Sequence, residues 1–314
     1  MSLLEVEGLN VGVAGSPHLL LREVAFDVGA GEILGIVGES GSGKTMASLA
    51  VIGLLPNGIE FRGGSVKLEN RELAYAARAS GRVSADISMI FQQPRSALNP
   101  TMRAGRQVAR VLETNQGLSK ADAKAQAVDM LRRVGIPGAD RVARAYPHQL
   151  SGGMCQRVMI AMAMACRPRL LIADEPTTAL DVTIQAQIFD LIRSLVDEIG
   201  CGVLFITHDL AAVAEMCDRV VVMYGGQIME RAGIADLLDG PEHPYTRYLL
   251  DAVDKEVDHR IVDVGVNFAL KGCRFSHRCP HAHHACNELP PLYSLGDGHA
   301  SACFLNKDGR VVAS

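Results

Sequence analysis

The residues Gly38 to Thr45, GESGSGKT, have the types and spacing of a phosphate-binding loop. The loop lies between an apolar run with strand character and a segment with helical character, so its backbone N–H groups would form a cradle for anions. Glycines are needed there because a Cβ atom would hold the backbone away from phosphates. Lys44 would reach the β- and γ-phosphates, and the Thr45 hydroxyl would bind Mg²⁺. The predicted nucleotide-binding residues of this loop are Gly38, Glu39, Ser40, Gly41, Ser42, Gly43, Lys44 and Thr45.

Two adjacent carboxylates follow the short apolar run of LLIADEP. Asp174 would hold Mg²⁺, directly or through water, and Glu175 would accept a proton from the attacking water. Taken alone, the pair could equally cap a strand. Because it follows a phosphate-binding loop in the same chain, it predicts a hydrolytic centre.

A second anion site is predicted at LSGGMCQR, residues 150–157. Ser151, Gly152 and Gly153 open an apolar helix whose N-terminus would favour negative charge. One chain does not need two cradles for one nucleotide. The second cradle is therefore predicted to serve a neighbouring subunit.

Four of the eight cysteines are clustered near the C-terminus, in and after GCRFSHRCPHAHHAC. Structural zinc sites open with shorter Cys spacings than these, whereas four thiolates also suit an iron–sulfur cluster. Three alternatives remain open: a cluster, zinc, or unlinked reduced thiols. A metal would hold together a segment with few apolar residues, in a structural or redox-sensing role. The candidate ligands are Cys273, Cys279, Cys286 and Cys303, with His277, His281, His283, His284 and His299 as competitors that a Cys₄ set does not need.

The elements that would position these residues alternate between strands and helices. RLLIAD (169–174) and GVLFIT (202–207) predict buried parallel strands. Ser119 is a predicted helix N-cap, and Gly200 is predicted to end a helix. This alternation predicts an α/β fold with a mostly parallel sheet covered on both faces. The predicted domains are a nucleotide-binding domain over 1–253, with a helical subdomain at about 95–165, and a Cys-rich extension over 254–314.

The composition narrows the class of protein. The chain has 314 residues, of which 48% are hydrophobic, and a net charge of −4, which argues against a nucleic-acid binder. No stretch is long and apolar enough for a membrane span, and the N-terminus lacks the features of a signal peptide. We therefore expect a cytosolic location, where thiols stay reduced.

Six motifs stand together in one order, and in that order they resemble the ATP-binding subunit of an ATP-binding cassette (ABC) transporter. The resemblance covers about residues 3–253 and implies a P-loop cassette ATPase that hydrolyses ATP with Mg²⁺. It also implies a mixed, mostly parallel sheet, a helical signature subdomain and a small Cys-rich tail. The motifs are the phosphate loop (38–45), Gln92 in MIFQQPRSALNP, LSGGM (150–154), ADEP (173–176), ALD (179–181) and His208 in THD.

The resemblance implies that two such domains meet head to tail and sandwich ATP between them. Lys44 of one domain and Ser151 with Gly153 of the other would grip the same γ-phosphate. Asp181 would lie across the dimer interface. Closure of the pair would assemble the site, and hydrolysis would release it.

The resemblance also assigns catalytic roles. His208 would contact the γ-phosphate and hold the attacking water with Glu175. Gln92 would complete the Mg²⁺ shell with Thr45 and Asp174, and would signal the closed state to the membrane partner. The family usually stacks an aromatic residue on adenine, but NVGVAGSPHLLL has none. His18 could substitute, or the partner chain could provide the tighter site.

Further stretches resemble the oligopeptide/dipeptide/nickel importers: IGLLP, QQPRSALNP, YPHQLSGGM, MYGGQIME, HPYTRYLL and the GCRF…RCP tail. This implies the first-type ATPase chain of a heterodimer, at the cytoplasmic face of the inner membrane. The implied partners are a homologous second ATPase, two membrane permease subunits and an extracytoplasmic substrate-binding protein. The tail would hold a [4Fe–4S] cluster, with Zn²⁺ as the alternative. Peptides are the expected cargo, with nickel, opines or glutathione as alternatives and a soluble ATPase of DNA repair or translation as a distant one.

Overall fold

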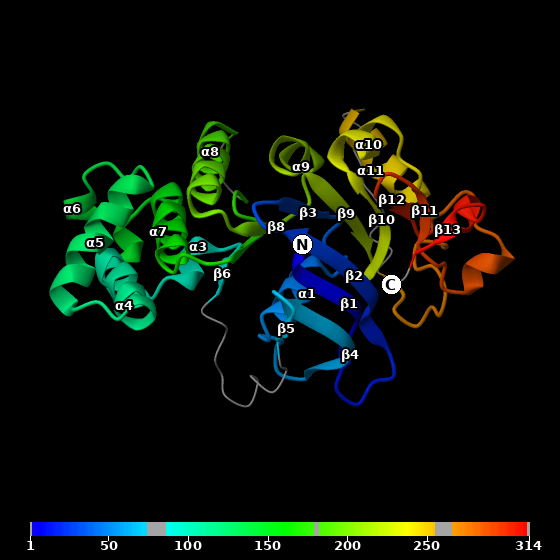
Figure 1. Ribbon diagram of the computed structural model, residues 1–314, viewed down its shortest axis with the longest axis horizontal. Coiled ribbons are helices and arrows are strands. Elements are labelled where there is room, and N and C mark those ends of the chain that lie inside the picture. Colours follow the sequence, from blue (N-terminus) through cyan, green and yellow to red (C-terminus); the bar gives the residue numbers. More distant parts are fainter. Residues whose placement is uncertain (1, 74–85, 179–181, 255–265, 313–314) are drawn as a thin grey trace. The chain divides into compact units, whose positions relative to one another are not determined.

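The computed structural model describes residues 2–73, 86–178, 182–254 and 266–312 (Figure 1). The chain divides into two compact units. The first unit comprises residues 1–83 and 205–314, and the second comprises residues 84–204. The first unit is therefore assembled from both ends of the chain, with the second unit as an insertion between them.

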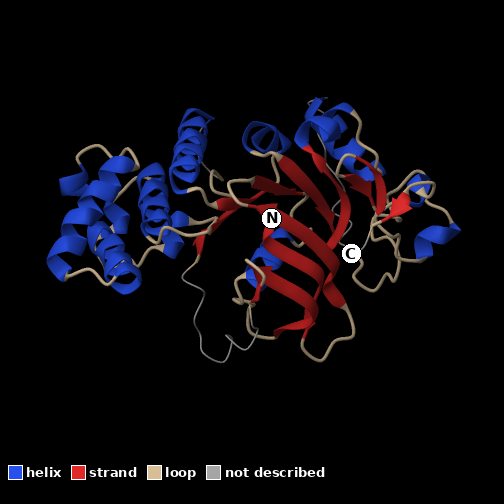
Figure 2. Cartoon of the chain, in the orientation of Figure 1, coloured by secondary structure: helices blue, strands red, loops and turns tan. Residues whose placement is uncertain are grey.

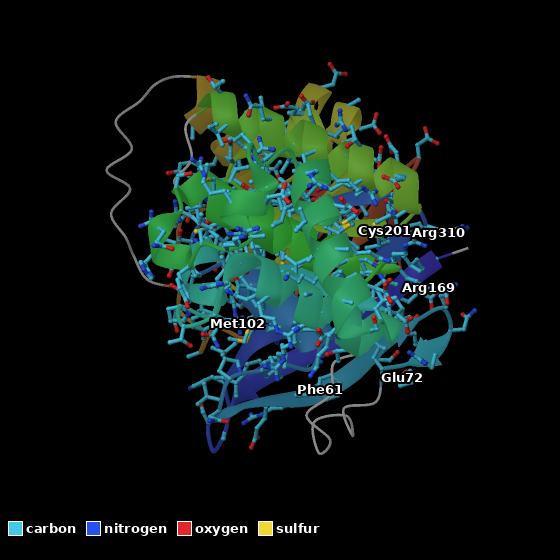
Figure 3. The ribbon with its side chains drawn as sticks, turned by 90° about the vertical axis from the view of Figure 1, so that its left-hand side faces the viewer. Phe61, Glu72, Met102, Arg169, Cys201 and Arg310 are labelled. Atoms are coloured by element: carbon cyan, nitrogen blue, oxygen red, sulfur yellow. The ribbon has the colours of Figure 1, made fainter. Side chains whose placement is uncertain are left out.

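The first unit begins with an antiparallel four-stranded sheet in the order β2-β1-β4-β5. Strand β1, an interior strand of this sheet, alternates buried residues such as Leu4 and Val6 with more exposed ones, as expected for a sheet with one covered face. Phe61 of β4 and Glu72 of β5 are labelled in Figure 3. The strands are β1 (Ser2–Val13), β2 (Leu19–Gly29), β4 (Ile59–Leu68) and β5 (Arg71–Glu72).

A second sheet of the first unit has the order β13-β11-β12-β10-β9-β3. Its strand β3 is fully buried and pairs in parallel with β9, whereas β9 and β10 are antiparallel. These strands are β3 (Ile33–Val37), β9 (Arg219–Tyr224), β10 (Gln227–Gly233), β11 (Tyr293–Gly296), β12 (His299–Ser301) and β13 (Arg310–Val311). The helices of this unit are α1 (Lys44–Val51), α9 (Leu210–Met216), α10 (Ile234–Asp239) and α11 (Pro244–Asp254), with short 3₁₀ turns at His284–Asn287 and Phe304–Asn306.

The Cys-rich extension joins this second sheet. Strand β12 pairs with β10, with Glu230 opposite Ser301 and Arg231 opposite Ala300. The amide of Ala302 also donates to the Met229 carbonyl over 2.8 Å. The C-terminal strands thus lie beside β10 (Figure 1) and belong to the same compact unit as the phosphate-binding loop.

The second unit combines short parallel strands with a group of helices (Figure 2). Strands β6 and β7 pair in parallel, from Ile87 opposite Leu170 to Ile90 opposite Ala173. Strand β8 (Gly202–Thr207) contributes residues to both units. The other elements are β6 (Ile87–Ile90), α3 (Pro94–Ala97), α4 (Ala104–Gln116), α5 (Lys120–Arg133), α6 (Ala139–Val142), a 3₁₀ turn (Pro147–Gln149), α7 (Gly152–Ala165), β7 (Leu170–Asp174) and α8 (Val182–Ile199).

The predicted α/β P-loop fold with a mixed sheet is confirmed, as are two local details. The side chain of Ser119 accepts a hydrogen bond from the Asp122 amide at the start of α5. Helix α8 ends at Ile199, and Gly200 follows with φ 71°, a left-handed conformation that suits glycine. The predicted domain boundaries at residues 253 and 254 remain predictions.

No helix among the described residues is long and apolar enough to cross a lipid bilayer.

Candidate active site

The phosphate-binding loop lies between β3 and α1 and closes around the Lys44 side chain. The Lys44 ammonium donates to the carbonyls of Gly38, over 2.7 Å, and of Glu39, over 3.0 Å, and lies 3.4 Å from the Ser42 hydroxyl. Lys44 is only 5% exposed. Gly43, the N-cap of α1, has φ 100°. The sequence-predicted loop residues therefore form one continuous turn around a buried cation, as a phosphate site requires.

The end of β9 and the turn that follows it pack closely against the backbone of the loop. A Cβ atom on Gly38 would lie 2.1 Å from the carbonyl oxygen of Met223, so only glycine fits there. The Gly226 amide donates to the Ser42 carbonyl over 2.7 Å. This close backbone packing explains the glycine that begins the motif.

Glu39 of the loop is held by two residues that sequence reasoning missed. Its main-chain amide donates to the Tyr245 hydroxyl over 2.9 Å. Its carboxylate accepts two hydrogen bonds from Arg278, of 2.8 and 3.1 Å. Burial lowers the pKa of Arg278, but the hydrogen bonds to Glu39 and Tyr224 outweigh it and raise that pKa above its ordinary range. Tyr245 lies in HPYTRYLL, and Arg278 lies between two of the clustered cysteines. Nothing in the sequence around either residue indicated a contact with Glu39.

The second unit brings Gln92 and Glu175 together. Asp174 ends β7 and is 3% exposed, and Glu175 follows it with φ 46°, a conformation that non-glycine residues rarely adopt. The Glu175 carboxylate accepts from Gln92 Nε2 over 2.6 Å and from the Thr178 hydroxyl over 2.8 Å. Two predicted site residues are thus in direct contact, and Thr178 is a third member that sequence reasoning missed.

His208 belongs to the first unit and is exposed directly after β8. The next residue, Asp209, caps helix α9 by accepting from the Ala211 amide, and its own amide donates to the Thr207 hydroxyl over 3.0 Å. This arrangement fixes the backbone on both sides of His208. The predicted Asp181 lies outside the described residues.

The LSGG motif forms the start of helix α7. The Ser151 side chain accepts from the Met154 amide over 3.2 Å, which makes it the helix N-cap. A Cβ atom added to Gly152 would meet no heavy atom within 4 Å. A Cβ atom added to Gly153 would meet only the side chain of Ile184, at 3.5 Å. The helix N-terminus therefore presents an open backbone within its unit, as an anion site for an incoming group requires.

The four clustered cysteines line a single cavity, together with His243, His281 and His283. All eight cysteines of the chain are free thiols. Burial raises the pKa of Cys273 to about 12, and burial also raises the pKa of Cys279 and Cys303. Four thiols that line one cavity have the donor chemistry of a thiolate-bound metal group.

The described part of the chain holds no group of three or more His, Cys, Asp or Glu side chains arranged to bind a metal ion. The predicted metal ligands in the Cys-rich extension and at the Mg²⁺ site are therefore not confirmed.

Two family models match the chain. A model described as ABC transporter matches residues 21–178. A model described as oligopeptide/dipeptide transporter, C-terminal region, matches residues 229–286. The second match includes HPYTRYLL and three of the four clustered cysteines.

Curated relatives match nearly the full length. The oligopeptide transport ATP-binding protein OppD of Salmonella typhimurium is 47% identical, over 96% of this chain and 93% of its own. The dipeptide transport ATP-binding protein DppD of Haemophilus influenzae is 43% identical, over 99% and 98%. The oligopeptide transport ATP-binding protein AppD of Bacillus subtilis is 43% identical, over 98% of each chain.

Solved structures share the fold. An ATP-binding cassette captured as a dimer in a post-hydrolysis state with ADP and Pi is 28% identical, with a TM-score of 0.63, over 74% of this chain and 98% of that chain. CbiO1 of Clostridium perfringens is 24% identical, with a TM-score of 0.67, over 84% and 97%. The predicted resemblance is confirmed: the chain belongs to the ABC transporter family, as an ABC-type ATPase that carries the oligopeptide/dipeptide transporter C-terminal region.

Proposed function

We propose that this ATPase powers the import of peptides through a membrane ABC transporter. The observation that carries the proposal is the oligopeptide/dipeptide transporter C-terminal region at residues 229–286, within a chain that matches peptide-transport ATPases over nearly its full length. Nickel, opine or glutathione import is the alternative, because the stretch QQPRSALNP also resembles nickel importers.

In the proposed reaction, the phosphate-binding loop holds the β- and γ-phosphates of ATP, with Lys44 released from the Gly38 and Glu39 carbonyls to bind them. A bound Mg²⁺ would neutralise charge that develops on the transferred phosphoryl group. Its proposed ligands are Thr45, Gln92 and Asp174.

Glu175 is the proposed general base. Its carboxylate accepts hydrogen bonds from Gln92 and Thr178, which orient it as the acceptor for a proton from water. His208 would contact the γ-phosphate and help to hold that water, and its fixed backbone supports such a positioning role.

We infer that the partners are a homologous second ATPase chain, two membrane permease subunits and an extracytoplasmic substrate-binding protein, with this chain at the cytoplasmic face of the inner membrane. The open N-terminus of α7 supports the inference, because Ser151 and Gly153 would bind the γ-phosphate of ATP held by the second ATPase. Asp181 is proposed to lie at that interface.

We further propose that Cys273, Cys279, Cys286 and Cys303 hold a [4Fe–4S] cluster. Their convergence on one cavity supports this assignment. Anaerobic purification followed by iron, sulfide and zinc analysis tests it. We expect about four irons and four sulfides per chain; one zinc, or no metal, would contradict the assignment.

The transport function is tested by reconstituting this chain with the proposed permease subunits and second ATPase in proteoliposomes. We expect ATP hydrolysis to rise when peptide-loaded binding protein is added, and peptide to accumulate in the lumen. A parallel reconstitution with Glu175→Gln should accumulate none. Stimulation by a nickel-loaded binding protein but not by a peptide-loaded one would favour the alternative. Copurification with ribosomes or nucleic acid instead of membrane subunits would overturn the proposal.

A further inference from the structure

The part of the Cys-rich extension over residues 272–286, here called the Cys-rich segment, contacts the phosphate-binding loop through Arg278. Arg278 directly precedes Cys279. The Arg278 guanidinium forms a two-pronged ion pair with Glu39, with Nη1–Oε2 and Nη2–Oε1 distances of 2.8 and 3.1 Å. Both side chains are largely buried, with exposed fractions of 16% for Arg278 and 25% for Glu39. This geometry fixes both partners, unlike an ordinary surface ion pair.

Aromatic rings hold the Arg278 guanidinium in place. It lies over the rings of Tyr248, at 5.1 Å from the centroid, and Tyr224, at 5.6 Å. Stacking on aromatic rings already restricts the side-chain conformations of an arginine, so it loses little conformational entropy when it pairs with a carboxylate. Arg278 is therefore preorganised to hold Glu39 in one position.

Tyr245 of α11 provides a second, independent contact with the same loop residue. Its hydroxyl accepts from the Glu39 amide over 2.9 Å, and its side chain is fully buried. Its ring packs against Tyr224 and Phe275, with centroid distances of 4.8 and 5.2 Å. Because Phe275 lies between Cys273 and Cys279, this aromatic cluster ties the Cys-rich segment to the loop backbone.

A second arginine of the segment, Arg274, contacts the start of strand β2. It is 1% exposed and donates to the carbonyls of Leu19, over 2.7 Å, and Leu20, over 3.3 Å. It also donates to the Gly225 carbonyl in the turn behind the loop. The segment thus contacts both β2 and the support of the phosphate site.

The Glu39 carboxylate carries a charge that opposes nucleotide binding. Its backbone belongs to the loop that would receive a polyanion, and like charges close to one another repel. Arg278 neutralises that charge. In addition, the Glu39 carbonyl accepts from Lys44 over 3.0 Å, so a shift of the Glu39 backbone also moves a partner of the phosphate-binding lysine.

We propose that Arg278 is a positioning residue for ATP binding, which neutralises Glu39 and couples the order of the Cys-rich segment to occupancy of the phosphate-binding loop. The coupling is reciprocal: a segment that stabilises the loop for nucleotide is itself stabilised by nucleotide. It acts through the chain's own side chains and does not depend on which group, if any, the cysteines bind.

The first test compares dissociation constants for Mg²⁺-ATP and Mg²⁺-ADP on the full chain by calorimetry. Arg278→Gln is expected to weaken both by roughly tenfold, because Glu39 is left unneutralised beside the phosphates. Adding Glu39→Gln to that variant should recover most of the loss, since it removes the repulsion. Arg310→Gln is the matched control: Arg310 is exposed on β13 and should leave both constants unchanged (Figure 3).

The rescue separates charge neutralisation from a merely structural role. A double variant that binds no more tightly than Arg278→Gln would overturn the proposal, as would wild-type affinity in Arg278→Gln itself. If Arg278→Gln does not fold, Glu39→Gln alone remains informative. That variant is expected to bind ATP at least as tightly as the wild type, and a tenfold loss would overturn the proposed role of the charge.

The second test measures amide hydrogen exchange of residues 272–286 with and without Mg²⁺-ADP. We expect nucleotide to slow exchange there severalfold in the wild type and in Arg310→Gln, but not in Arg278→Gln. Equal exchange with and without nucleotide in the wild type would refute the coupling.

Discussion

At the residue scale, the hydrolytic centre depends on how Glu175 is held. Its backbone adopts φ 46°, which costs about 1–3 kcal/mol for a non-glycine residue. Both of its carboxylate partners, Gln92 and Thr178, donate to one oxygen. The unfavourable backbone and the two donors together fix the direction of the carboxylate.

Replacing Glu175 with Gln should lower the rate of ATP hydrolysis by roughly 10²–10⁴-fold, because an amide cannot accept the proton of the attacking water. ATP affinity should be retained. Steady-state kcat and an equilibrium binding curve measure the two effects separately. The exposed Glu72 on β5 provides the control substitution Glu72→Gln (Figure 3). A kcat within a factor of three of the wild type would show that another group takes the proton.

Cys201 should make the stability of the protein fall at high pH. It is 1% exposed, and burial raises its pKa from 9.0 to about 11. Between these values the unfolded chain loses a proton that the folded chain keeps, so the free energy of unfolding falls as pH rises from 9 to 11, by at most ~3 kcal/mol. Denaturant titrations at pH 8, 9, 10 and 11 give the free energy of unfolding at each pH. This free energy should fall less steeply with pH in Cys201→Ala than in Cys166→Ala, where Cys166 is half-buried. Parallel slopes would contradict this.

The phosphate-binding loop, Asp174 and Glu175 could be proposed from the residues themselves, because their chemistry is concentrated in short motifs. Gln92 was proposed only through the family resemblance. The sequence did not predict Arg278, whose ion-pair partner lies 239 residues away. Nothing in the local pattern distinguishes an arginine that pairs with the loop from one on the surface. Thr178 was missed for a different reason, since its hydroxyl serves a side chain only three residues earlier.

At the scale of elements, a buried carboxylate connects three parts of the C-terminal region. Glu230 of β10 is fully buried and accepts from the amides of Glu242, over 2.8 Å, and His243, over 2.9 Å. His299 of β12 lies 2.7 Å from the same carboxylate. This residue thus links β10, the start of α11 and the added strand β12.

His299→Ala should loosen β11 and β12, because it leaves a buried carboxylate with two main-chain donors and one lost partner, at a cost of about 1–3 kcal/mol. Hydrogen exchange of residues 293–301 should accelerate, while exchange in β3 stays unchanged. The exposed His284→Ala serves as the control. Identical exchange of β12 in the variant and the wild type would mean that its backbone pairing alone holds it.

The elements that the sequence predicted well are those with a single strong local signal. Strands β3, β7 and β8 are continuous apolar runs, and all of their residues are buried. The pairing of the N-terminal strands into a separate antiparallel sheet, and of β12 with β10, depends on register between distant segments. Four-residue helices such as α3 and α6 leave too short a pattern to detect.

At the scale of the whole molecule, the N-terminus of α7 is the proposed site for the nucleotide held by a second ATPase chain. Ser151→Arg should therefore leave the chain's own affinity for Mg²⁺-ATP within about twofold, and lower hydrolysis by the assembled pair more than tenfold, because a large cation there blocks closure. Fluorescent-nucleotide titration of the single chain and turnover of the reconstituted complex measure the two effects. Loss of binding in the single chain would place Ser151 in its own nucleotide site.

The assembly of the first unit from both ends of the chain has a consequence for its synthesis. Glu39 leaves the ribosome long before Arg278, its partner 239 residues later. At roughly 5–20 residues per second, this gap lasts about 10–50 s. During translation the nascent phosphate-binding loop therefore lacks its ion pair with Arg278 until the C-terminal region of the first unit has emerged.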